Sequence, residues 1–557
     1  MSFGSRLMVA GFAVWSAVAV SWSATAQPAE VSLDADLVSL VRNAESGQVI
    51  QLGAGTYEIA DELIFTNSGV TLQGLADGSS RVVFAEGYTP PAMDSVALID
   101  LNGQSNITLK NIELSGENRT SGATYGVYAF GGSGHRIENL DVVQLNDPGE
   151  FGPIGVYFNG GVDQSVVRHS TFTQIGVNSD FGSGIRIHGD ADGNLIEHNT
   201  IDQTGRGGIF ALGNNDGPTL GTSTLDDLVI RHNTVTNSAL SGGPDLGIEV
   251  QNDIRDAVIE NNVIDRRISV DNAQRVAVRD NTITQASNNT VATGAYGVEI
   301  VNAQDIVATG NQVLGDVHLG VSISGDGDTR HALFADNLIQ NATTFGVQVQ
   351  GRDNADATGV AEDLYFLNNE ITGTLGGPPS LYYPDFITGD GVRFNMAFDD
   401  ITLDQNTIAD NGGEDLFLND TPVGSTVALS DNITDDTYVE GNGLELITPP
   451  LTQQTFIAEV GESITVTFDD LDGTFTHVLW DTGQGAPIAA AHASVTLTAE
   501  WLGDSRRVVV VAWDDAGGAD TAVVLIPEPG LAVMALSGGL LFTLRPSRRS
   551  RPWPSSL

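Results

Sequence analysis

The chain has 557 residues and carries 71 acidic side chains against 24 basic ones, which gives a formal net charge of −47 at pH 7. This negative field excludes nucleic acid and anionic membrane surfaces as partners, and it repels polyanionic substrates unless Ca²⁺ or a local arginine cluster offsets it. Because the chain has no cysteine, its stability must come from a large apolar core rather than from disulfides.

Residues 1–26 have the pattern of a secretory signal peptide. One basic residue, Arg6, precedes an apolar run over residues 7–20, and small residues lead up to Ala26. This order is typical of an export signal that is cleaved, here after Ala26. We therefore expect the protein to be exported through the inner membrane.

A repeated phrase runs from about Tyr125 to Asp410, within a domain that we assign to residues 27–415. Each copy opens with glycine and alternating apolar residues, as in Gly184-Ile-Arg-Ile-His188, and continues to a second phrase with a fixed asparagine, as in Ile196-Glu-His-Asn199. The period of roughly 30 residues and the period-two alternation of Val and Ile predict stacked coils of short strands. A β-propeller would need four strands per repeat. We predict an all-β fold, a right-handed parallel β-helix, with inward aliphatic side chains and stacked asparagines.

The asparagine column defines the coils of this stack. Ser170 takes the place of asparagine in one coil. The column comprises Asn111, Asn139, Asn199, Asn233, Asn262, Asn281, Asn311, Asn337, Asn369 and Asn406.

The repeat resembles that of the pectin-lyase-like superfamily of right-handed β-helix proteins over residues 30–415. Residues 37–43 form a short capping helix in this interpretation, and the segments that begin at Val49, Gly53, Leu63 and Gly69 are similar to the opening coils of that superfamily. The resemblance is specific for the fold and weak for activity. It implies that one outer face of the stack is the floor of a saccharide-binding groove.

The composition changes after the last repeat. Residues 416–453 are expected to close the stack and to serve as a linker. In residues 454–526, alternation and turn residues predict a small β-sandwich of immunoglobulin-like type. We expect this unit to act in spacing or binding rather than in chemistry.

Residues 527–557 resemble a PEP-CTERM sorting tail. Pro527-Glu-Pro529 precedes an apolar run over residues 530–544, and four arginines follow. The run is short for a span of ~20 residues, and the arginines orient it with its tail in the cytoplasm. The resemblance implies processing by an exosortase, a transient membrane association, and a final place at the surface or in the matrix of a Gram-negative bacterium.

Residues two and four positions after each glycine are predicted to form a column outside the stack. Its middle gathers rings, arginine, histidine and carboxylates over about 25 Å. The alternative interpretation is that these outward polar residues only face solvent. The mixture of aromatic and ionisable side chains favours a ligand-binding site instead. The pairs are Tyr128/Phe130, Tyr157/Asn159, Arg186/His188, Phe210/Leu212, Glu249/Gln251, Ser269/Asp271, Glu299/Val301, Ser322/Ser324, Gln348/Gln350 and Arg393/Asn395.

Lyase or epimerase chemistry is the mechanism that we favour from the sequence. It needs a cation beside the substrate carboxylate and a base. Arg186 is the predicted cation, with His188 or Tyr157 as base and acid and Arg206 as a second cation. Tyr128, Phe210, Arg206, Gln251 and Asp271 are the predicted substrate-binding residues. The only lysine, Lys110, belongs to an asparagine phrase, which disfavours a lysine-dependent lyase.

Hydrolysis is the alternative, with Glu249 and Glu299 as the two carboxyl groups. They lie two coils apart, so their backbones are ~9.6 Å apart, and Asp271 lies between them. This separation favours a mechanism that inverts the anomeric configuration. Asp245 is a further candidate acid. A third interpretation is a non-catalytic surface or matrix protein that binds exopolysaccharide.

The histidines are not predicted to hold a metal. His169, His198 and His232 precede the asparagine column on successive coils and should stack as a ladder that lacks converging carboxylates. His135, His318, His331, His477 and His492 show no constellation in the sequence. Aspartate-rich turns offer oxygen ligands to Ca²⁺, but the sequence contains no EF-hand loop. Ca²⁺ binding therefore stays an open alternative, and no cofactor is predicted as certain.

Overall fold

The computed structural model describes most of the chain between residues 29 and 525. The predicted signal peptide, the sorting tail, Asp245 and His492 lie outside the described residues. No helix among the described residues is long and apolar enough to cross a membrane. The described ranges are 29–88, 96–117, 124–146, 152–213, 225–241, 246–284, 296–315, 317–324, 328–350, 360–376, 389–395, 398–419, 426–434, 437–440, 445–447, 454–457, 464–467, 475–483, 485–490, 494–497, 507–514 and 519–525.

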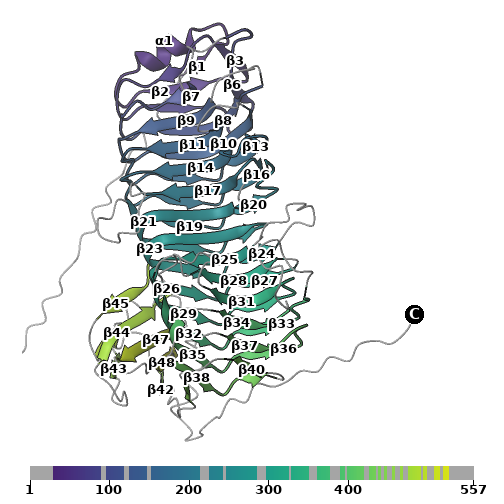
Figure 1. Ribbon diagram of the computed structural model, residues 1–557. Coiled ribbons are helices and arrows are strands. Elements are labelled where there is room, and N and C mark those ends of the chain that lie inside the picture. Colours follow the sequence, from purple (N-terminus) through teal and green to yellow (C-terminus); the bar gives the residue numbers. More distant parts are fainter. Residues whose placement is uncertain are drawn as a thin grey trace, which may run out of the picture.

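The described residues form a long stack of parallel coils that confirms the predicted right-handed β-helix (Figure 1). The predicted capping helix, α1 (Leu37–Arg42), lies at the first end of the stack. Asp36 caps its N-terminus, because the carboxylate accepts a hydrogen bond from the Ser39 backbone N–H at 3.0 Å. Leu37 and Val41 are buried, so the helix covers the apolar interior that the first coil would otherwise expose.

Each coil contributes to three columns of parallel strands. Column A contains β4 (Leu63–Ile64), β7 (Val96–Asp100), β9 (Thr124–Phe130), β11 (Ile154–Asn159), β14 (Ser183–His188), β17 (Gly207–Leu212), β21 (Leu246–Glu260), β23 (Arg267–Arg279), β25 (Tyr296–Val301), β28 (Leu319–Ser324), β31 (Phe345–Gln350), β34 (Val392–Asn395), β37 (Leu416–Asn419) and β40 (Thr437–Glu440). The long strands β21 and β23 continue into column B.

Column B also contains β1 (Glu30–Val31), β2 (Val49–Leu52), β5 (Thr71–Gln73), β8 (Thr108–Ser115), β10 (Arg136–Leu145), β12 (Val166–Arg168), β15 (Leu195–Glu197), β18 (Leu225–Asp226), β19 (Val229–Arg231), β26 (Gln304–Thr309), β29 (Thr329–Ala335), β32 (Ala361–Leu367), β35 (Phe398–Asp404), β38 (Thr426–Ser430) and β41 (Glu445–Ile447). The strands β8 and β10 continue into column C. The other strands of column C are β3 (Gly55–Ile59), β6 (Ser80–Phe84), β13 (Thr171–Ile175), β16 (Thr200–Thr204), β20 (Thr234–Thr236), β22 (Val263–Ile264), β24 (Thr282–Thr284), β27 (Gln312–Leu314), β30 (Leu338–Gln340), β33 (Glu370–Thr372), β36 (Thr407–Ala409) and β39 (Ile433–Thr434).

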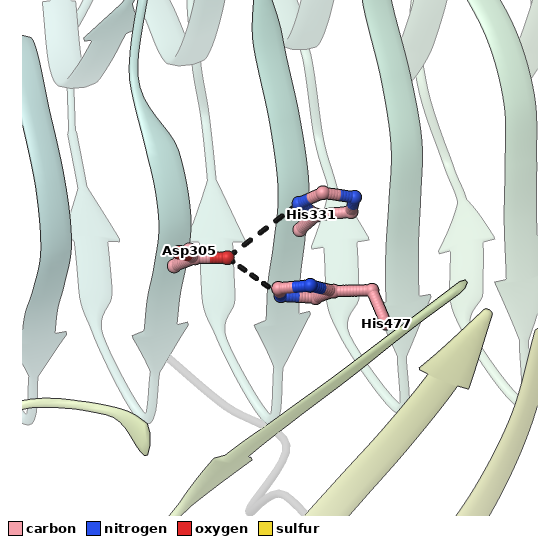
Figure 2. A group of neighbouring side chains, drawn as sticks. All are labelled: Asp305, His331 and His477. Carbon is pink, nitrogen blue, oxygen red and sulfur yellow. Dashed lines mark ion pairs between the residues drawn. The ribbon is translucent and has the colours of Figure 1, made fainter. Parts of the chain in front are cut away.

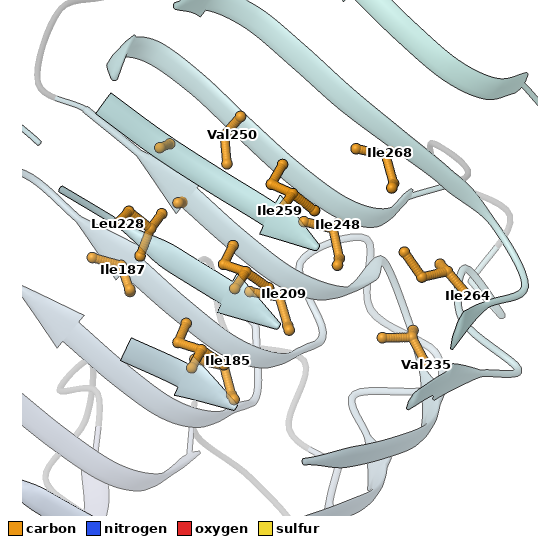
Figure 3. Close-up of a cluster of buried hydrophobic side chains, with 14 of the residues drawn as sticks. Ile185, Ile187, Ile209, Leu228, Val235, Ile248, Val250, Ile259, Ile264 and Ile268 are labelled. Carbon is orange, nitrogen blue, oxygen red and sulfur yellow. The ribbon is translucent and has the colours of Figure 1, made fainter. Parts of the chain in front are cut away.

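Aliphatic side chains fill the interior of the stack (Figure 3). Ile185 and Ile187 are buried, and so are Val298 and Ile300 at the equivalent positions four coils further on. The prediction that the first and third residues after each glycine point inward is therefore confirmed. Burying each such side chain contributes about 1.5–3 kcal/mol, and the repetition of this gain along the stack stabilises a fold without disulfides.

The glycine that opens each coil is required by close packing between coils. A Cβ atom on Gly297 would lie 2.3 Å from the carbonyl oxygen of Gly320 in the next coil and 2.5 Å from Val313 Cγ1. The coil at Ile268 lacks this glycine, and the strand pairing there shifts register between Leu246 and Ile248. A bulge in the pairing thus compensates for the missing glycine, and the residues from Ile268 onward keep the register of the other coils.

Buried asparagines hydrogen-bond from coil to coil, as predicted. The Oδ1 atom of each asparagine accepts from the backbone N–H and from Nδ2 of the asparagine one coil earlier, at 2.8–3.1 Å. Ser170 joins the ladder, because its N–H donates to Asn199 Oδ1. The ladder comprises Asn199, Asn233, Asn262, Asn281, Asn311, Asn337, Asn369, Asn406 and Asn432.

Asn111 and Asn139 do not belong to this ladder, contrary to the prediction. Leu140, not Asn139, pairs with the ladder position of the next coil, because the Leu140 N–H donates to Ser170 Oγ. Asn111 and Asn139 occupy the preceding turn position, with φ of 58° and 52°. Asparagine tolerates the left-handed region better than most residues do, so the same amino acid serves two neighbouring positions for two different reasons.

Replacing Asn262 with alanine is expected to lower the free energy of unfolding by about 1–3 kcal/mol. The change leaves the buried N–H and Nδ2 of Asn233 without their acceptor. Chemical denaturation followed by far-UV circular dichroism measures the loss. Val263→Ala is the matched control, because Val263 is 47% exposed; an equal loss in both variants would contradict a structural role of the ladder.

The stack extends beyond residue 415, where the sequence analysis placed its end. The strands β37 and β40 continue column A, and β38 and β41 continue column B as far as Ile447. Asn406 also donates to Asn432 in this extension. The last coils lack the glycine phrase that identified the others, although Leu416 and Leu418 still fill the core.

The C-terminal residues form a small β unit that packs against column B (Figure 1). Its main sheet, named here the C-terminal sheet, has the order β42 (Gln454–Ile457), β48 (Ala519–Leu525), β47 (Arg507–Asp514), β44 (Phe475–Asp481) and β45 (Ile488–Ala490). Two further strands, β43 (Ile464–Thr467) and β46 (Ser494–Leu497), pair with each other. The immunoglobulin-like topology stays a prediction.

The contact between the C-terminal sheet and the stack is apolar with a buried ion pair. Leu333 and Tyr365 of the stack share one buried cluster with Leu479, Val511 and Trp513 of the C-terminal sheet. Arg279, at the end of β23, lies with Nη1 3.0 Å from Asp481 Oδ1 and is 3% exposed. Column B has apolar residues on its outer side here, which explains why the unit docks onto the stack.

Candidate functional site

The predicted outer column of residues lies in column A with the predicted register. Tyr157 pairs with Tyr128 and Arg186, Arg186 pairs with Phe210, and Phe210 pairs with Glu249. The pairing continues through Ser269 to Glu299. These strands bring all ten predicted candidate residues onto this face or its edge, and we call the set the candidate face.

The candidate face is less exposed than the sequence analysis implied. The residues two positions after the glycine are largely buried, with exposures of 7% for Tyr157, 5% for Arg186, 3% for Phe210 and 6% for Glu249. The residues four positions after the glycine, such as His188 and Gln251, are half-buried. Long side chains in adjacent coils cover one another, so the accessible row is the second one.

Three tyrosines gather at the first end of the candidate face. The ring centroids of Tyr125 and Tyr128 are 5.3 Å apart, and Tyr157 lies 5.3 Å from Tyr125 and 5.6 Å from Tyr128. Asn159 Nδ2 donates to the Tyr128 hydroxyl at 3.4 Å. Aromatic rings with polar edges are suited to stacking on apolar surfaces of a ligand.

The three residues predicted for lyase chemistry lie together. The Tyr157 hydroxyl is 3.3 Å from His188 Nδ1, and Arg186 lies two positions before His188 on the same strand and faces the same side. Burial raises the pKa of Tyr157 to about 12, although the nearby Arg186 lowers it. Burial also lowers the pKa of Arg186, whose guanidinium stacks on the Phe210 ring at 4.8 Å. Arg186 is thus held against the protein rather than presented outward.

Glu249 has the environment of an acid that titrates near neutral pH. Burial raises its pKa to about 7, against the lowering effect of Arg206 and Arg267. Arg206 Nη2 is 3.8 Å from Glu249 Oε2, and that oxygen has no hydrogen-bond partner among the described residues. Arg206 also stacks on Phe210 at 5.0 Å. A carboxyl group with so perturbed a pKa is a candidate for acid–base chemistry.

Glu299 lies in a different environment, two coils further along. Arg267 Nη1 is 2.8 Å from Glu299 Oε2, and Ser269 Oγ donates to the same oxygen at 2.9 Å. These contacts suit an ionised carboxylate. The two predicted carboxyl groups are therefore distinguished by their surroundings, one desolvated and one paired with a cation.

Sequence reasoning missed residues at the position before each glycine. Arg267 pairs with Leu246 there, and Tyr125 and Tyr296 occupy the equivalent place on their strands. The Arg267 guanidinium lies 5.5 Å from the centre of the Tyr296 ring. The rings of Tyr125 and Tyr128 stack at 5.3 Å, so the residue before the glycine reaches the same outer face as the residue two positions after it, and this signal was present in the repeat.

The histidine ladder on the turns is confirmed. The rings of His169 and His198 stack at 5.1 Å, and those of His198 and His232 stack at 4.8 Å. Their backbones have φ of 53–56°, the same left-handed turn position as Asn139.

The prediction that His331 and His477 belong to no constellation is wrong. Although they are far apart in the sequence, docking of the C-terminal sheet brings both to Asp305 (Figure 2). Of the other histidines, His135 is fully buried, and His318 Nδ1 lies 2.7 Å from Thr344 Oγ1.

These features define the class of the fold, a right-handed parallel β-helix with a polar and aromatic outer face. Residues 97–266 match the family model described as the right handed beta helix region. A search of curated proteins returned no significant match.

Solved structures with similar folds include three carbohydrate-related proteins. The tailspike protein of E. coli bacteriophage HK620 in complex with a hexasaccharide is 12% identical, covers 89% of this chain and 89% of its own, and has a TM-score of 0.50. An alginate lyase from Paenibacillus sp. str. FPU-7 is 18% identical and covers 54% of this chain and 92% of its own, with a TM-score of 0.32. The catalytic unit of a thermostable α-1,3-glucanase from Streptomyces thermodiastaticus is 15% identical. The alignment covers 72% of this chain and 66% of the glucanase chain, with a TM-score of 0.36. At these identities the similarity shows the fold alone.

Proposed function

We propose that this protein is an exported polysaccharide-processing protein that hydrolyses glycosidic bonds at the candidate face, with Glu249 as general acid and Glu299 as general base. The observation that carries the proposal is the contrast between the two carboxyl groups. When two carboxyl groups lie in different environments, the desolvated one is usually assigned as the acid and the one beside a cation as the base. In this proposal the predicted tail directs the protein to the cell surface after exosortase processing.

The backbone spacing of the two glutamates is the basis for proposing an inverting mechanism. Glu249 and Glu299 are separated by the one intervening coil that carries Ser269, so their backbones are ~9.6 Å apart. Inverting glycosidases place their carboxyl groups roughly 6.5–9.5 Å apart to admit a water molecule. Glu249 protonates the leaving oxygen, and Glu299 activates the water on the opposite side of the sugar.

The surrounding residues suit a saccharide ligand. Tyr128, the half-buried one of the three tyrosines, offers a ring for stacking, while Gln251 and Asp271 lie in the half-buried row beside Glu249. Arg186, Arg206 and Arg267 add local positive charge to a chain with a net charge of −47. The face therefore suits neutral glycans, and Arg206 and Arg267 offer positive charge to anionic ones.

Lyase or epimerase chemistry is a second candidate, because the Tyr157 hydroxyl and His188 Nδ1 lie 3.3 Å apart. It is the weaker one. A tyrosine with a pKa of about 12 is a poor base at neutral pH, and the Arg186 guanidinium stacks on the Phe210 ring rather than facing outward.

The test is to incubate the purified protein with a panel of neutral and uronic polysaccharides, with and without Ca²⁺. New reducing ends without absorbance near 235 nm are the expected result. Reducing ends accompanied by that absorbance would instead support the lyase assignment. Retention on a glycan in a pull-down without any cleavage would support the non-catalytic surface or matrix protein.

A further inference from the structure

Three side chains from distant parts of the chain meet where the C-terminal sheet packs on the stack (Figure 2). Asp305 lies on β26, His331 on β29 and His477 on β44. His477 Nε2 is 2.7 Å from Asp305 Oδ1, and His331 Nδ1 is 3.5 Å from the same oxygen. One ligand atom from each residue lies within 4.8 Å of the others.

The contact between His477 and Asp305 is an ion pair when the imidazole is protonated, and its geometry departs from an aligned hydrogen bond. Asp305 Oδ1 and His477 Nε2 are buried atoms without an aligned hydrogen-bond partner among the described residues, despite their separation of 2.7 Å. The other carboxylate oxygen, Oδ2, accepts from Gln274 Nε2 at 3.2 Å. The Asp305 carboxylate is thus fixed with Oδ1 toward the two imidazoles.

A further carboxylate orients His331. The Nε2 atom of His331 is 3.2 Å from Asp363 Oδ2 on β32, which leaves Nδ1 directed toward Asp305. Histidines that bind a metal through one nitrogen usually donate the other N–H to a carboxylate or carbonyl, which sets the tautomer and the ring orientation. The position of Asp363 is the one that this arrangement requires.

The charge and the burial of the cluster also suit a cation. Asp305 is 3% exposed, and the side chains of His331 and His477 are 21% and 16% exposed. The indole of Trp513 lies beside both rings, with centroids 5.7 Å and 6.1 Å away. With neutral imidazoles, the carboxylates of Asp305 and Asp363 carry two negative charges that a divalent ion neutralises.

We propose that Asp305, His331 and His477 bind one divalent transition-metal ion of the zinc type, and that the ion fastens the C-terminal sheet to the β-helix. Two imidazoles and one carboxylate are a donor set that zinc prefers, with bonds of about 2.0–2.2 Å and a fourth position for water. Such bonds at tetrahedral angles place ligand atoms about 3.3 Å apart, and the two distances to Asp305 Oδ1, 2.7 Å and 3.5 Å, bracket that value. The two imidazole rings stack in parallel with centroids 3.8 Å apart, so they turn slightly to direct both nitrogens at one ion.

Docking does not depend on the ion alone, because the buried contact between Arg279 and Asp481 and the apolar cluster around Trp513 belong to the same interface. The ion therefore adds to a surface that is already complementary. Without it, protonated imidazoles form ion pairs with Asp305 and Asp363.

Zinc content per chain, measured by mass spectrometry after loading with Zn²⁺ and dialysis, tests the proposal. The wild-type protein is expected to retain about one ion with tetrahedral ligation, and His477→Gln and Asp305→Asn are expected to lose it. Asp363→Asn should weaken zinc binding by about 10–100-fold. His198→Gln, in the histidine ladder on the turns, is the matched control and should retain the ion. Circular dichroism confirms that each variant is folded.

X-ray absorption at the zinc edge gives a second readout that needs no variant. Scattering from two imidazoles and additional oxygen ligands is the expected spectrum. Zinc retention that is unchanged in His477→Gln, or lost in His198→Gln, would overturn the proposal and assign binding to the surface ladder. A wild-type protein that retains no zinc would show that the cluster is a proton-linked ion pair only.

Discussion

Replacing Glu249 with glutamine is expected to slow polysaccharide cleavage by about 10²–10⁴-fold, the usual contribution of a general acid. Glutamine keeps the shape of the side chain but has no proton to give to the leaving oxygen. The change removes no hydrogen bond to the Glu249 Oε2 atom among the described residues, so the fold should persist. Initial rates of reducing-end release, measured at saturating substrate, give the effect.

The pH profile supplies a further signature of the same residue. Only protonated Glu249 can act as the acid, and burial raises its pKa to about 7. The rate of cleavage should therefore fall as the pH rises through about 7. The residual activity of Glu249→Gln should not show this decline.

Glu197→Gln is the matched control for this experiment. Glu197 is a buried carboxylate on β15 in column B, and its Oε2 atom lies 2.8 Å from Arg231 Nη2. This variant should keep the wild-type rate and the wild-type pH profile. Full activity in Glu249→Gln, or an equal loss in both variants, would contradict the assignment of the acid.

Replacing Ile300 with aspartate is expected to destabilise the protein by more than about 5 kcal/mol. Ile300 is 0% exposed in the core of the stack, so the change removes a packed aliphatic group and forces a charge into an apolar space. We expect the soluble yield to collapse, and the thermal transition of any soluble fraction to occur at a lower temperature.

The neighbouring residue is the control, because successive residues of a strand face opposite sides. Val301 is half-buried on the outside of the stack, and Val301→Asp should unfold within about 1 kcal/mol of the wild type, as surface changes usually do. Similar behaviour of the two variants in a thermal melt would contradict the inward assignment of Ile300.

The stack and the register of the candidate face could be predicted from the sequence because both depend on local periodicity. Alternation placed Ile300 inside and Glu299 outside, and the glycine phrase aligned Arg186 with Glu249 across the intervening coil. The asparagine ladder followed from the same repeat. Asn111 and Asn139 were misassigned because asparagine is also favoured in the left-handed turn one position earlier.

Features that depend on long-range packing could not be predicted. The burial of Glu249 and Arg186 follows from how long side chains of adjacent coils lie over one another, and the repeat does not contain that information. His331 and His477 meet only because an apolar patch on column B accepts the C-terminal sheet. No spacing in the sequence relates these two histidines to Asp305.

A proton NMR time course on a cleaved polysaccharide tests the central claim most directly. It records whether new reducing ends appear, which anomer forms first, and whether unsaturated sugar protons arise. We predict new reducing-end signals of inverted anomeric configuration with the wild-type protein, and none on the same timescale with Glu249→Gln. Unsaturated products, retained configuration, or cleavage that Glu249→Gln leaves unchanged would contradict hydrolysis by Glu249 and Glu299.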